Sequence, residues 1–184
     1  PAQRAAIFDP PADHATIERL YTLGPDDLVQ VVRRRRGPNR IGHAVQLCYL
    51  RHPGRALVAG EAVPDAMLDL LAGQIGCNAT DFASYAARPT TLREHRAEIE
   101  AWLGLRAFEG ADVRSMLAVG SEIAASTDRG ETIVAGMVDR LRLGRIVLPA
   151  ASTLERLALI VRTRARKAAH AGLIQNCPAE QDSS

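Results

Sequence analysis

The sequence predicts an all-α fold of two small helical bundles, and three observations support this prediction. Apolar residues recur at the spacing of about 3.6 residues that lines one face of a helix, and the alternation typical of strands is nearly absent. Aromatic residues make up only 4% of the 184 residues although 47% are hydrophobic, so the core is expected to consist of Leu, Ala, Val and Ile, a mixture that favours helices over sheets. Helix start and stop signals, with Pro in a first turn and Gly after a last turn, recur along the chain.

Six helices are expected in the first part of the chain. A short helix precedes a second one, which begins with Pro25 and two acidic residues and runs into four consecutive arginines. Acidic residues favour a helix amino terminus because they complement its dipole. Gly37-Pro38 is expected to end the second helix, and Asn39 to cap the third. The expected ranges are 13–21, 24–36, 40–50, 64–75, 80–87 (or 78–87, if Asn78 is the start) and 91–103.

Residues 105–111 are the predicted linker to a second group of helices, which helix-start signals place at 112–126, 131–143 and 152–171. The stretch "LGRIVLPA" between the last two is predicted to be extended. The expected domains are therefore a first helical DNA-binding subdomain at 1–106, a second one at 107–174 and a flexible tail at 175–184.

Positive charge is concentrated in two windows of the chain. Residues 28–60 contain seven arginines, two histidines and no acidic residue, and residues 140–170 contain eight Lys or Arg against the single acid Glu155. The formal net charge of the whole chain is only +2, so the remainder is acidic. Such segregation of charge is typical of proteins that bind nucleic acid.

The run of four arginines at 33–36 has two interpretations from its sequence alone. Adjacent guanidinium groups repel one another, so a bound polyanion such as a phosphate backbone explains why they are held together. Alternatively, the run is a solvated helix end, where arginine also complements the helix dipole.

A helix-turn-helix unit is predicted in "DFASYAARPTTLREHRAEIEAWLG", which reads as a short helix, a four-residue turn and an amphipathic helix. Thr91 and Glu94 have the spacing of a capping box at the start of the second helix. The hydroxyl groups of the first turn are suited to phosphate, and Arg93 and Arg96 to base edges. Any helical bundle contains such hairpins, so an ordinary structural hairpin is the alternative.

A second candidate element runs from Arg145 into the last long helix. Ser152 opens another capping-box spacing, and several cations crowd the far end of the helix. These cations either track a phosphate backbone or form a solvated helix terminus. The candidate DNA-binding residues of the chain are Arg33, Arg34, Arg35, Arg36, Asn39, Arg40, Arg88, Thr90, Thr91, Arg93, Arg96, Arg145, Ser152, Thr153, Arg156, Arg164 and Lys167.

No pattern in the sequence indicates enzymatic chemistry. The five histidines are scattered without the spacing of a metal site, and no phosphate-binding glycine loop or nucleophile elbow is present. The three cysteines are far apart, which favours a reducing cytoplasm over a disulfide scaffold. No catalytic residue, cofactor, metal or membrane span is therefore expected.

Four segments resemble the amino-terminal region of the Tn-three family of replicative transposases, which act on bacterial transposable elements. They are "YTLGPDDLVQVVRRRRGPNRIGHAVQLCYLRHPGRAL", "AGQIG", "FASYAARPTTLREHRAEIEAWLG" and "GRIVLPAASTLERL". The resemblance extends from about residue 7 to residue 173 and keeps the order of long motifs.

The resemblance implies a module that binds the terminal inverted repeats of a transposon as double-stranded DNA. It also implies that the catalytic domain, which is RNase H-like, lies elsewhere in the parent transposase, so this part of it is not an enzyme. Self-association through the full-length transposase is a further implied possibility. A helical scaffold that assembles transposase protomers is the alternative, and RNA binding is disfavoured because few aromatic residues are available to stack on bases.

Overall fold

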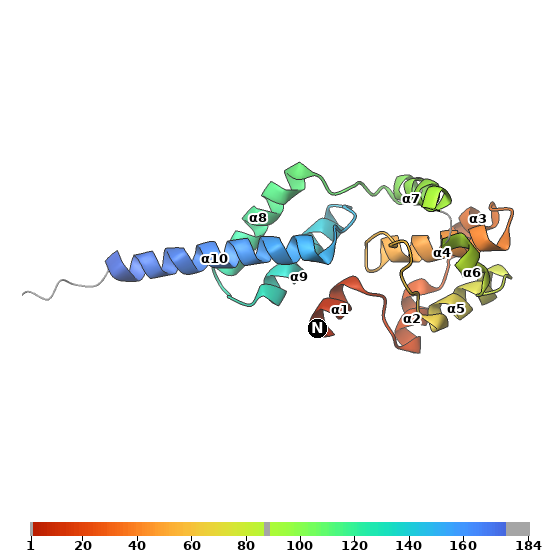
Figure 1. Ribbon diagram of the computed structural model, residues 1–184, viewed down its shortest axis with the longest axis horizontal. Helices are drawn as coiled ribbons and strands as arrows, with labels where there is room; N and C mark the ends of the chain where they lie inside the picture. Colours follow the sequence, from red (N-terminus) through yellow and green to blue (C-terminus); the bar gives the residue numbers. More distant parts are fainter. Residues whose placement is uncertain (1, 87–88, 176–184) are drawn as a thin grey trace, which may run out of the picture. The chain divides into compact units, whose positions relative to one another are not determined.

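The computed structural model of the protein describes residues 2–86 and 89–175. Within these residues it contains ten α-helices and no strand longer than an isolated bridge, which confirms the predicted all-α fold (Figure 1). The helices are α1 (Ala2–Phe8), α2 (His14–Tyr21), α3 (Pro25–Val32), α4 (Gly37–Arg51), α5 (Asp65–Ile75), α6 (Asp81–Ala86), α7 (Pro89–Leu103), α8 (Gly110–Ala124), α9 (Gly130–Leu143) and α10 (Ala151–Gln175).

Several helix ends follow directly from the residues that the sequence places there. Asp13 caps α2, because its carboxylate accepts a hydrogen bond of 2.9 Å from a backbone N–H in the first turn. Asp27 supports the start of α3 from inside its first turn, where its carboxylate accepts a hydrogen bond of 2.9 Å from the backbone N–H of the cap residue Gly24. Gly76 ends α5 with a φ of 65°, a conformation that costs glycine no steric strain.

The sequence predicted that the arginine run is the end of a helix. In the structure it is instead the connection between two helices. Helix α3 ends at Val32, and α4 begins at Gly37. Pro38 therefore lies in the first turn of α4. Its fixed φ is suitable there, and the absence of its N–H breaks no hydrogen bond, because the N–H groups of a first turn have no acceptor within the helix. Asn39 is inside this turn and is not the cap, a position held by Arg36.

Two further helices begin earlier than the capping-box spacings predicted. Helix α7 begins at Pro89, again with proline in a first turn, so Thr91 is inside the helix. Helix α10 begins at Ala151, one residue before Ser152. Helix α1 was not predicted, because seven residues are too few for a helical period to be recognised.

The chain divides into two compact units that are not separated by a single boundary. Unit 1 consists of Pro1–Phe108 and Leu141–Pro149, and unit 2 consists of Glu109–Arg140 and Ala150–Ser184. Residues 141–149, which the sequence analysis assigned to the second subdomain, thus belong to the first compact unit. The division into two DNA-binding subdomains stays a prediction, and the predicted tail lies outside the described residues apart from Gln175.

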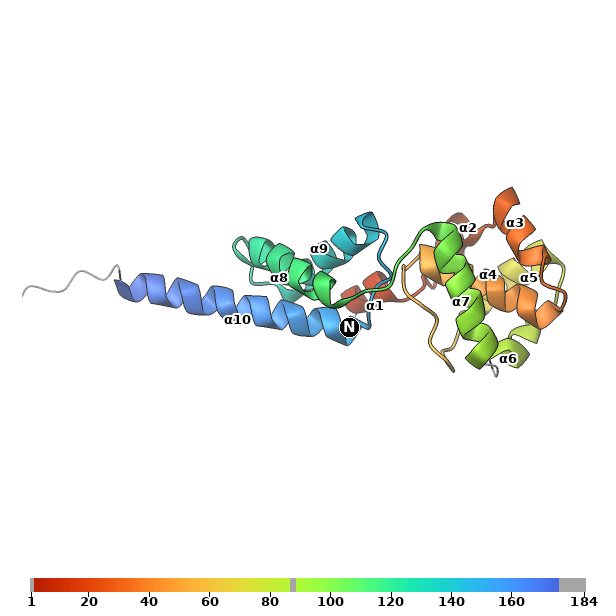
Figure 2. The same ribbon diagram turned by 90° about the horizontal axis from the view of Figure 1, so that it is seen from above.

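Helix α4 is the centre of unit 1. Its ten consecutive residues 41–50 are all buried, and α3, α5, α6 and α7 pack against it. Helix α7 crosses α4, as Figures 1 and 2 show. Helix α6 packs so closely on α4 that no space is left beside Gly42, because a Cβ atom there would lie 2.1 Å from the ring of Tyr85 in α6.

Residues 141–149 complete unit 1 through backbone pairing. The N–H of Arg106 donates to the carbonyl of Arg145 at 3.0 Å, and the N–H of Val147 donates to the carbonyl of Arg106 at 2.9 Å. The N–H of Leu148 donates to the carbonyl of Gly54 at 2.8 Å. Val147 also joins the hydrophobic core of the unit. The expected extended connection is found at residues 146–148, whereas Leu143 still belongs to α9 and residues 144–145 form a turn. Residues 141–149 thus serve as a structural strap of unit 1.

Unit 2 is built on the packing of α8 along α10. The last turns of α10 extend beyond α8 (Figure 1). Buried apolar residues in this unit come from all three of its helices: Met116 and Ala124 from α8, Ile133, Val134, Met137 and Val138 from α9, and Leu154, Leu157, Ala158 and Val161 from α10.

Candidate nucleic-acid interface

The four arginines between α3 and α4 do not share one environment. The side chains of Arg33, Arg35 and Arg36 are exposed, whereas the side chain of Arg34 is only 22% exposed. Arg33 makes one weak contact of 3.4 Å with Gln30 in α3. Arg35 and Arg36 form no hydrogen bond or ion pair with any residue that the structure describes, so their charges face solvent unpaired.

Arg34 is engaged on both its side chain and its backbone. Its Nη2 donates to a carboxylate oxygen of Glu98 in α7 and lies 3.2 Å from Nε2 of His43 in α4. Its carbonyl accepts a hydrogen bond of 2.7 Å from Nε of Arg40. Arg34 and Arg40, both candidates for DNA contact, therefore hold the connection in place. Glu98, which the sequence presents as an ordinary surface charge, has a structural partner.

A buried polar cluster continues from Arg34 into the core. The rings of His43 and His95 meet edge to face with centroids 5.2 Å apart, and Nδ1 of His95 lies 3.1 Å from the hydroxyl of Tyr85. Gln46 donates to the same hydroxyl and, at 2.9 Å, to the carbonyl of Leu92. The cluster links α4, α6 and α7. Sequence reasoning missed it because its members are isolated polar residues on apolar helix faces.

Burial keeps the histidines of this cluster neutral. Burial lowers the pKa of His43 to about 3, with a further contribution from the positive charge of Arg34. Burial also lowers the pKa of His95, and it raises the pKa of Tyr85 to about 12. None of the three groups therefore exchanges a proton near neutral pH, which fits a structural role.

Two more arginines of the first charged window are neutralised within unit 1. Arg51 forms an ion pair with the buried carboxylate of Asp27 and lies over the ring of Trp102. Arg55 pairs with Glu61 and donates to a backbone carbonyl at 2.6 Å. The hydrogen bonds from Arg51 and Gly24 outweigh the effect of burial, so that the pKa of Asp27 lies below its usual value.

The apparent excess of positive charge in this window is thus smaller than the sequence indicates. Acidic partners reach the window from outside it, from Asp27 and Glu61 at its borders and from Glu98 far along the chain. Of the four arginines without an acidic partner among the described residues, Arg40 is half-buried and held by a backbone carbonyl, and Arg33, Arg35 and Arg36 remain exposed to an external ligand.

The candidate DNA-binding residues of helix α7 differ in their exposure to solvent. Its buried face consists of Leu92, His95 and Ile99, and the other faces are half-buried or exposed. Thr90 and Arg93 are exposed, and Arg93 has no partner among the described residues. Thr91 is half-buried, and Arg96 pairs with Glu100 at 2.6 Å. Arg88 lies outside the described residues, so the turn of the predicted helix-turn-helix stays a prediction.

The second charged window is divided between the two units. Arg142 and Arg145 lie in unit 1, and the cations of α10 lie in unit 2. Arg145 adopts a φ of 52° and donates to the carbonyl of Leu103 at 2.9 Å, although its side chain is exposed. The sequence suggested that Arg145 begins the candidate element that continues into α10. In the structure Arg145 is instead a component of unit 1.

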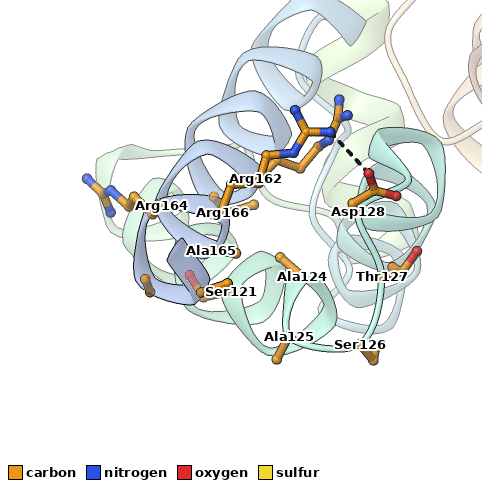
Figure 3. A pocket seen from close by; sticks show the side chains of 13 residues that line it. Ser121, Ala124, Ala125, Ser126, Thr127, Asp128, Arg162, Arg164, Ala165 and Arg166 are labelled. Atoms are coloured by element: carbon orange, nitrogen blue, oxygen red, sulfur yellow. Dashed lines mark hydrogen bonds and ion pairs between the residues drawn. The ribbon is translucent and has the colours of Figure 1, made fainter. Parts of the chain in front are cut away.

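In unit 2 the candidate residues lie along α10. Ser152, Arg156, Arg164 and Lys167 are exposed, and Thr153 is half-buried. A groove of about 660 Å³ separates the second part of α10 from the end of α8 and the turn that follows it (Figure 3). Alanines of α8 and α10 line this groove, and Arg162, Arg164 and Arg166 border it. An exposed ion pair of 3.1 Å joins Arg166 to Asp128.

Neither a metal site nor a membrane span was found in the described part of the chain. No three His, Cys, Asp or Glu side chains there are grouped so that they would hold a metal ion. None of the described helices is both long enough and apolar enough to cross a bilayer.

Comparison with known proteins identifies the family. A family described as "Domain of unknown function (DUF4158)" matches residues 1–161. The transposase for transposon Tn3926 of Escherichia coli is 34% identical over 93% of this chain, and the transposase for transposon Tn501 of Pseudomonas aeruginosa is 31% identical over 94% of it. The transposase for transposon Tn1546 of Enterococcus faecium is 32% identical over 91%.

The chain corresponds to only a small part of each relative. It spans 17%, 18% and 17% of the transposases of Tn3926, Tn501 and Tn1546. The matched residues include the arginine run, α4, α7 and the start of α10. The chain therefore belongs to the DUF4158 family and is homologous to Tn-three family transposases.

Proposed function

We propose that this chain is a double-stranded DNA-binding module that recognises the terminal inverted repeats of a transposon. The observation that carries the proposal is the exposed group Arg33, Arg35 and Arg36, which has no acidic partner among the described residues. Like charges held this close repel one another, and a phosphate backbone relieves that repulsion. The homology to transposases supports DNA as the polyanion.

The exposed arginines of the connection between α3 and α4 and the exposed arginine of helix α7 have different roles in DNA binding. Arg33, Arg35 and Arg36 lie in a connection between helices, where long side chains suit phosphate contacts that carry no sequence information. Arg93 lies in the first turns of a helix that is packed on α4, and a rigid helix is suited to aim a side chain at base edges.

Unit 2 supplies a second set of contacts under this proposal. Arg156 projects from the first turns of α10, and Arg164 and Lys167 are exposed further along the same helix. A helix carrying several cations without acidic partners among the described residues is suited to follow a phosphate backbone. Two units that contact successive parts of one duplex give a longer recognition site than either alone.

A competition experiment tests the proposal. The chain is bound to a labelled duplex with the inverted repeat of a related transposon, and unlabelled competitors are added at about 0.15 M salt, where nonspecific binding is screened but not abolished. We expect the inverted repeat to compete about 1,000-fold better than a scrambled duplex of the same composition, a ratio at the low end for sequence-specific binders. Equal competition by the two duplexes would refute end recognition.

The alternative is a helical scaffold that assembles transposase protomers, and the groove of unit 2 favours it as a second candidate. Alanines form an apolar part of its lining, which suits a helix of a partner protein, although three arginines also border it. Under this alternative neither duplex binds with an affinity that depends on salt, and the chain instead associates with longer transposase fragments in sedimentation experiments.

A further inference from the structure

We propose that Arg34 is a positioning residue that, with Glu98, fixes α7 against the connection between α3 and α4. It thereby sets the place of the exposed residues of α7 relative to Arg33, Arg35 and Arg36. This inference rests on the proposed DNA-binding function. It assigns Arg34 a different role from the three other arginines of the run, from which the sequence alone does not distinguish it.

The first support is the difference between Arg34 and the rest of the run. Its side chain is 22% exposed and reaches Glu98 and His43, while its carbonyl is held by Arg40. A guanidinium with two neighbours inside the protein is poorly placed to move toward a phosphate. Arg35, by contrast, is exposed and has no partner among the described residues.

The second support is that polar contacts hold α7 at several points along its length. Near its start, the carbonyl of Leu92 accepts a hydrogen bond from Gln46 of α4. Further along, Glu98 accepts one from Arg34. The two points are about 9 Å apart along the helix axis, because an α-helix rises about 1.5 Å per residue. Between these two points, Nδ1 of His95 lies 3.1 Å from the hydroxyl of Tyr85 in α6. The contact of Glu98 differs from the other two because it ties α7 to the connection between α3 and α4.

The third support is that the pair of Arg34 and Glu98 contributes little to the free energy of unfolding, although its geometry is specific. Glu98 is 52% exposed, so its pairing with Arg34 is screened by water and adds little to the free energy of unfolding. Base recognition is far more demanding, since the side chains that read a base have to be held in place by their supporting residues. Loss of the pair is therefore expected to alter recognition more than folding.

Glu98→Gln is the decisive variant, because it removes a negative charge. If electrostatics alone governed binding, this change would strengthen binding to every duplex. Under the positioning inference, binding to a scrambled duplex stays equal or rises, and the preference for the inverted repeat falls at least ~5-fold, which corresponds to about 1 kcal/mol. Arg34→Gln is expected to lower the preference by a similar factor.

Arg35→Gln is the matched control within the same run. It is expected to weaken binding to both duplexes in equal proportion and to reduce the magnitude of the salt slope by about one, as the loss of one phosphate contact does. The exchanged pair Arg34→Glu with Glu98→Arg restores the attachment with reversed direction, and we expect it to recover part of the preference lost in either single variant.

Two results would overturn the inference. One is a wild-type chain that prefers the inverted repeat together with a Glu98→Gln variant that keeps the whole preference. The other needs no DNA: amide hydrogen exchange in the middle of α7 is expected to be at least ~3-fold faster in Glu98→Gln than in the wild type, and unchanged exchange contradicts the attachment. A wild type without any preference refutes the proposed function, and the exchange measurement still decides the role of Arg34.

Discussion

Arginines of one charged window have opposite roles in this protein, and burial decides which role each has. Arg55 is 13% exposed at its side chain and is paired with Glu61, which is 18% exposed. Arg36 is exposed and caps α4 with its backbone only. The first is a component of the fold, and the second is available to a ligand. Substitutions at the two positions should therefore affect different properties.

Arg55→Ala is expected to reduce the free energy of unfolding by about 2–3 kcal/mol, because Glu61 is left half-buried without its partner. Arg36→Ala is expected to change it by less than about 0.5 kcal/mol, as exposed substitutions do. Chemical denaturation followed by far-ultraviolet circular dichroism measures both. Equal effects of the two changes would contradict the assignment of Arg55 to the fold.

The buried histidines make unit 1 sensitive to acid. The pKa of His43 is lowered from 6.5 to about 3 in the folded chain, so between these values the unfolded chain binds more protons. Stability is therefore complete above pH 6.5 and falls as the pH decreases toward 3. One such histidine contributes a slope of at most about 1.4 kcal/mol per pH unit well below 6.5.

His43→Gln is expected to make the free energy of unfolding less dependent on pH between 6.5 and 4.5. The variant loses stability at pH 8 because it loses native contacts, and this loss should shrink as the pH falls. Denaturation series at several pH values give the difference directly. A difference that stays constant from pH 8 to pH 4.5 would show that His43 takes up its proton in the folded chain.

At the scale of the helices, the tight approach of α4 to α6 depends on Gly42. A Cβ atom at Gly42 would lie 2.1 Å from the ring of Tyr85, which is fully buried and cannot move aside. Gly73 in α5 has nothing within 4 Å of the corresponding position. Both glycines are inside helices, so they form a matched pair in which only the neighbouring packing differs.

Gly42→Ala is expected to destabilise the chain by about 1–3 kcal/mol, the usual range for an overpacked core. Gly73→Ala is expected to stabilise it by about 0.5–1 kcal/mol, because alanine has the higher helix propensity and meets no neighbour. Thermal unfolding of the two variants gives the signs. A stabilising Gly42→Ala would contradict the packing of Tyr85 on α4.

Most of the helices were predictable because their signals are local. The caps of α2 and α3 and the glycine that ends α5 depend on residues within one turn of each end. The starts of α4 and α7 were misplaced because proline both ends helices and begins them, and its neighbours in the sequence do not decide between the two.

The candidate site was less predictable, since its charge balance depends on pairs distant in sequence. Arg34 and Glu98 are 64 residues apart, and neither position shows an unusual local pattern. Arg93 and Arg35 stay exposed, as their positions on polar stretches indicate. Only the tertiary contacts separate structural arginines from those left for a ligand.

At the scale of the whole molecule, each compact unit consists of two segments of the chain, so no single boundary in the sequence divides the two units. Unit 1 needs residues 141–149, whose backbone pairs with Arg106 and Gly54 and whose Val147 enters its core. A linear boundary near residue 106, which the sequence suggests, removes this strap from the first unit.

A chain that ends at residue 108 is therefore expected to be less stable than unit 1 in the full chain by about 2–4 kcal/mol, the scale of losing one buried aliphatic side chain and its backbone hydrogen bonds. Denaturation midpoints of the two chains give the comparison, with α4 and α7 monitored by hydrogen exchange. Equal stability would show that residues 141–149 are dispensable for unit 1.

The salt dependence of binding to a duplex with the inverted repeat tests most directly whether exposed cations bind DNA phosphates. If both units contribute, about six to eight phosphates are neutralised, and the logarithm of the affinity should fall with the logarithm of the salt concentration with a slope of about −5 to −7. A slope near zero between about 0.05 and 0.3 M salt would contradict the account, because phosphate contacts release counterions.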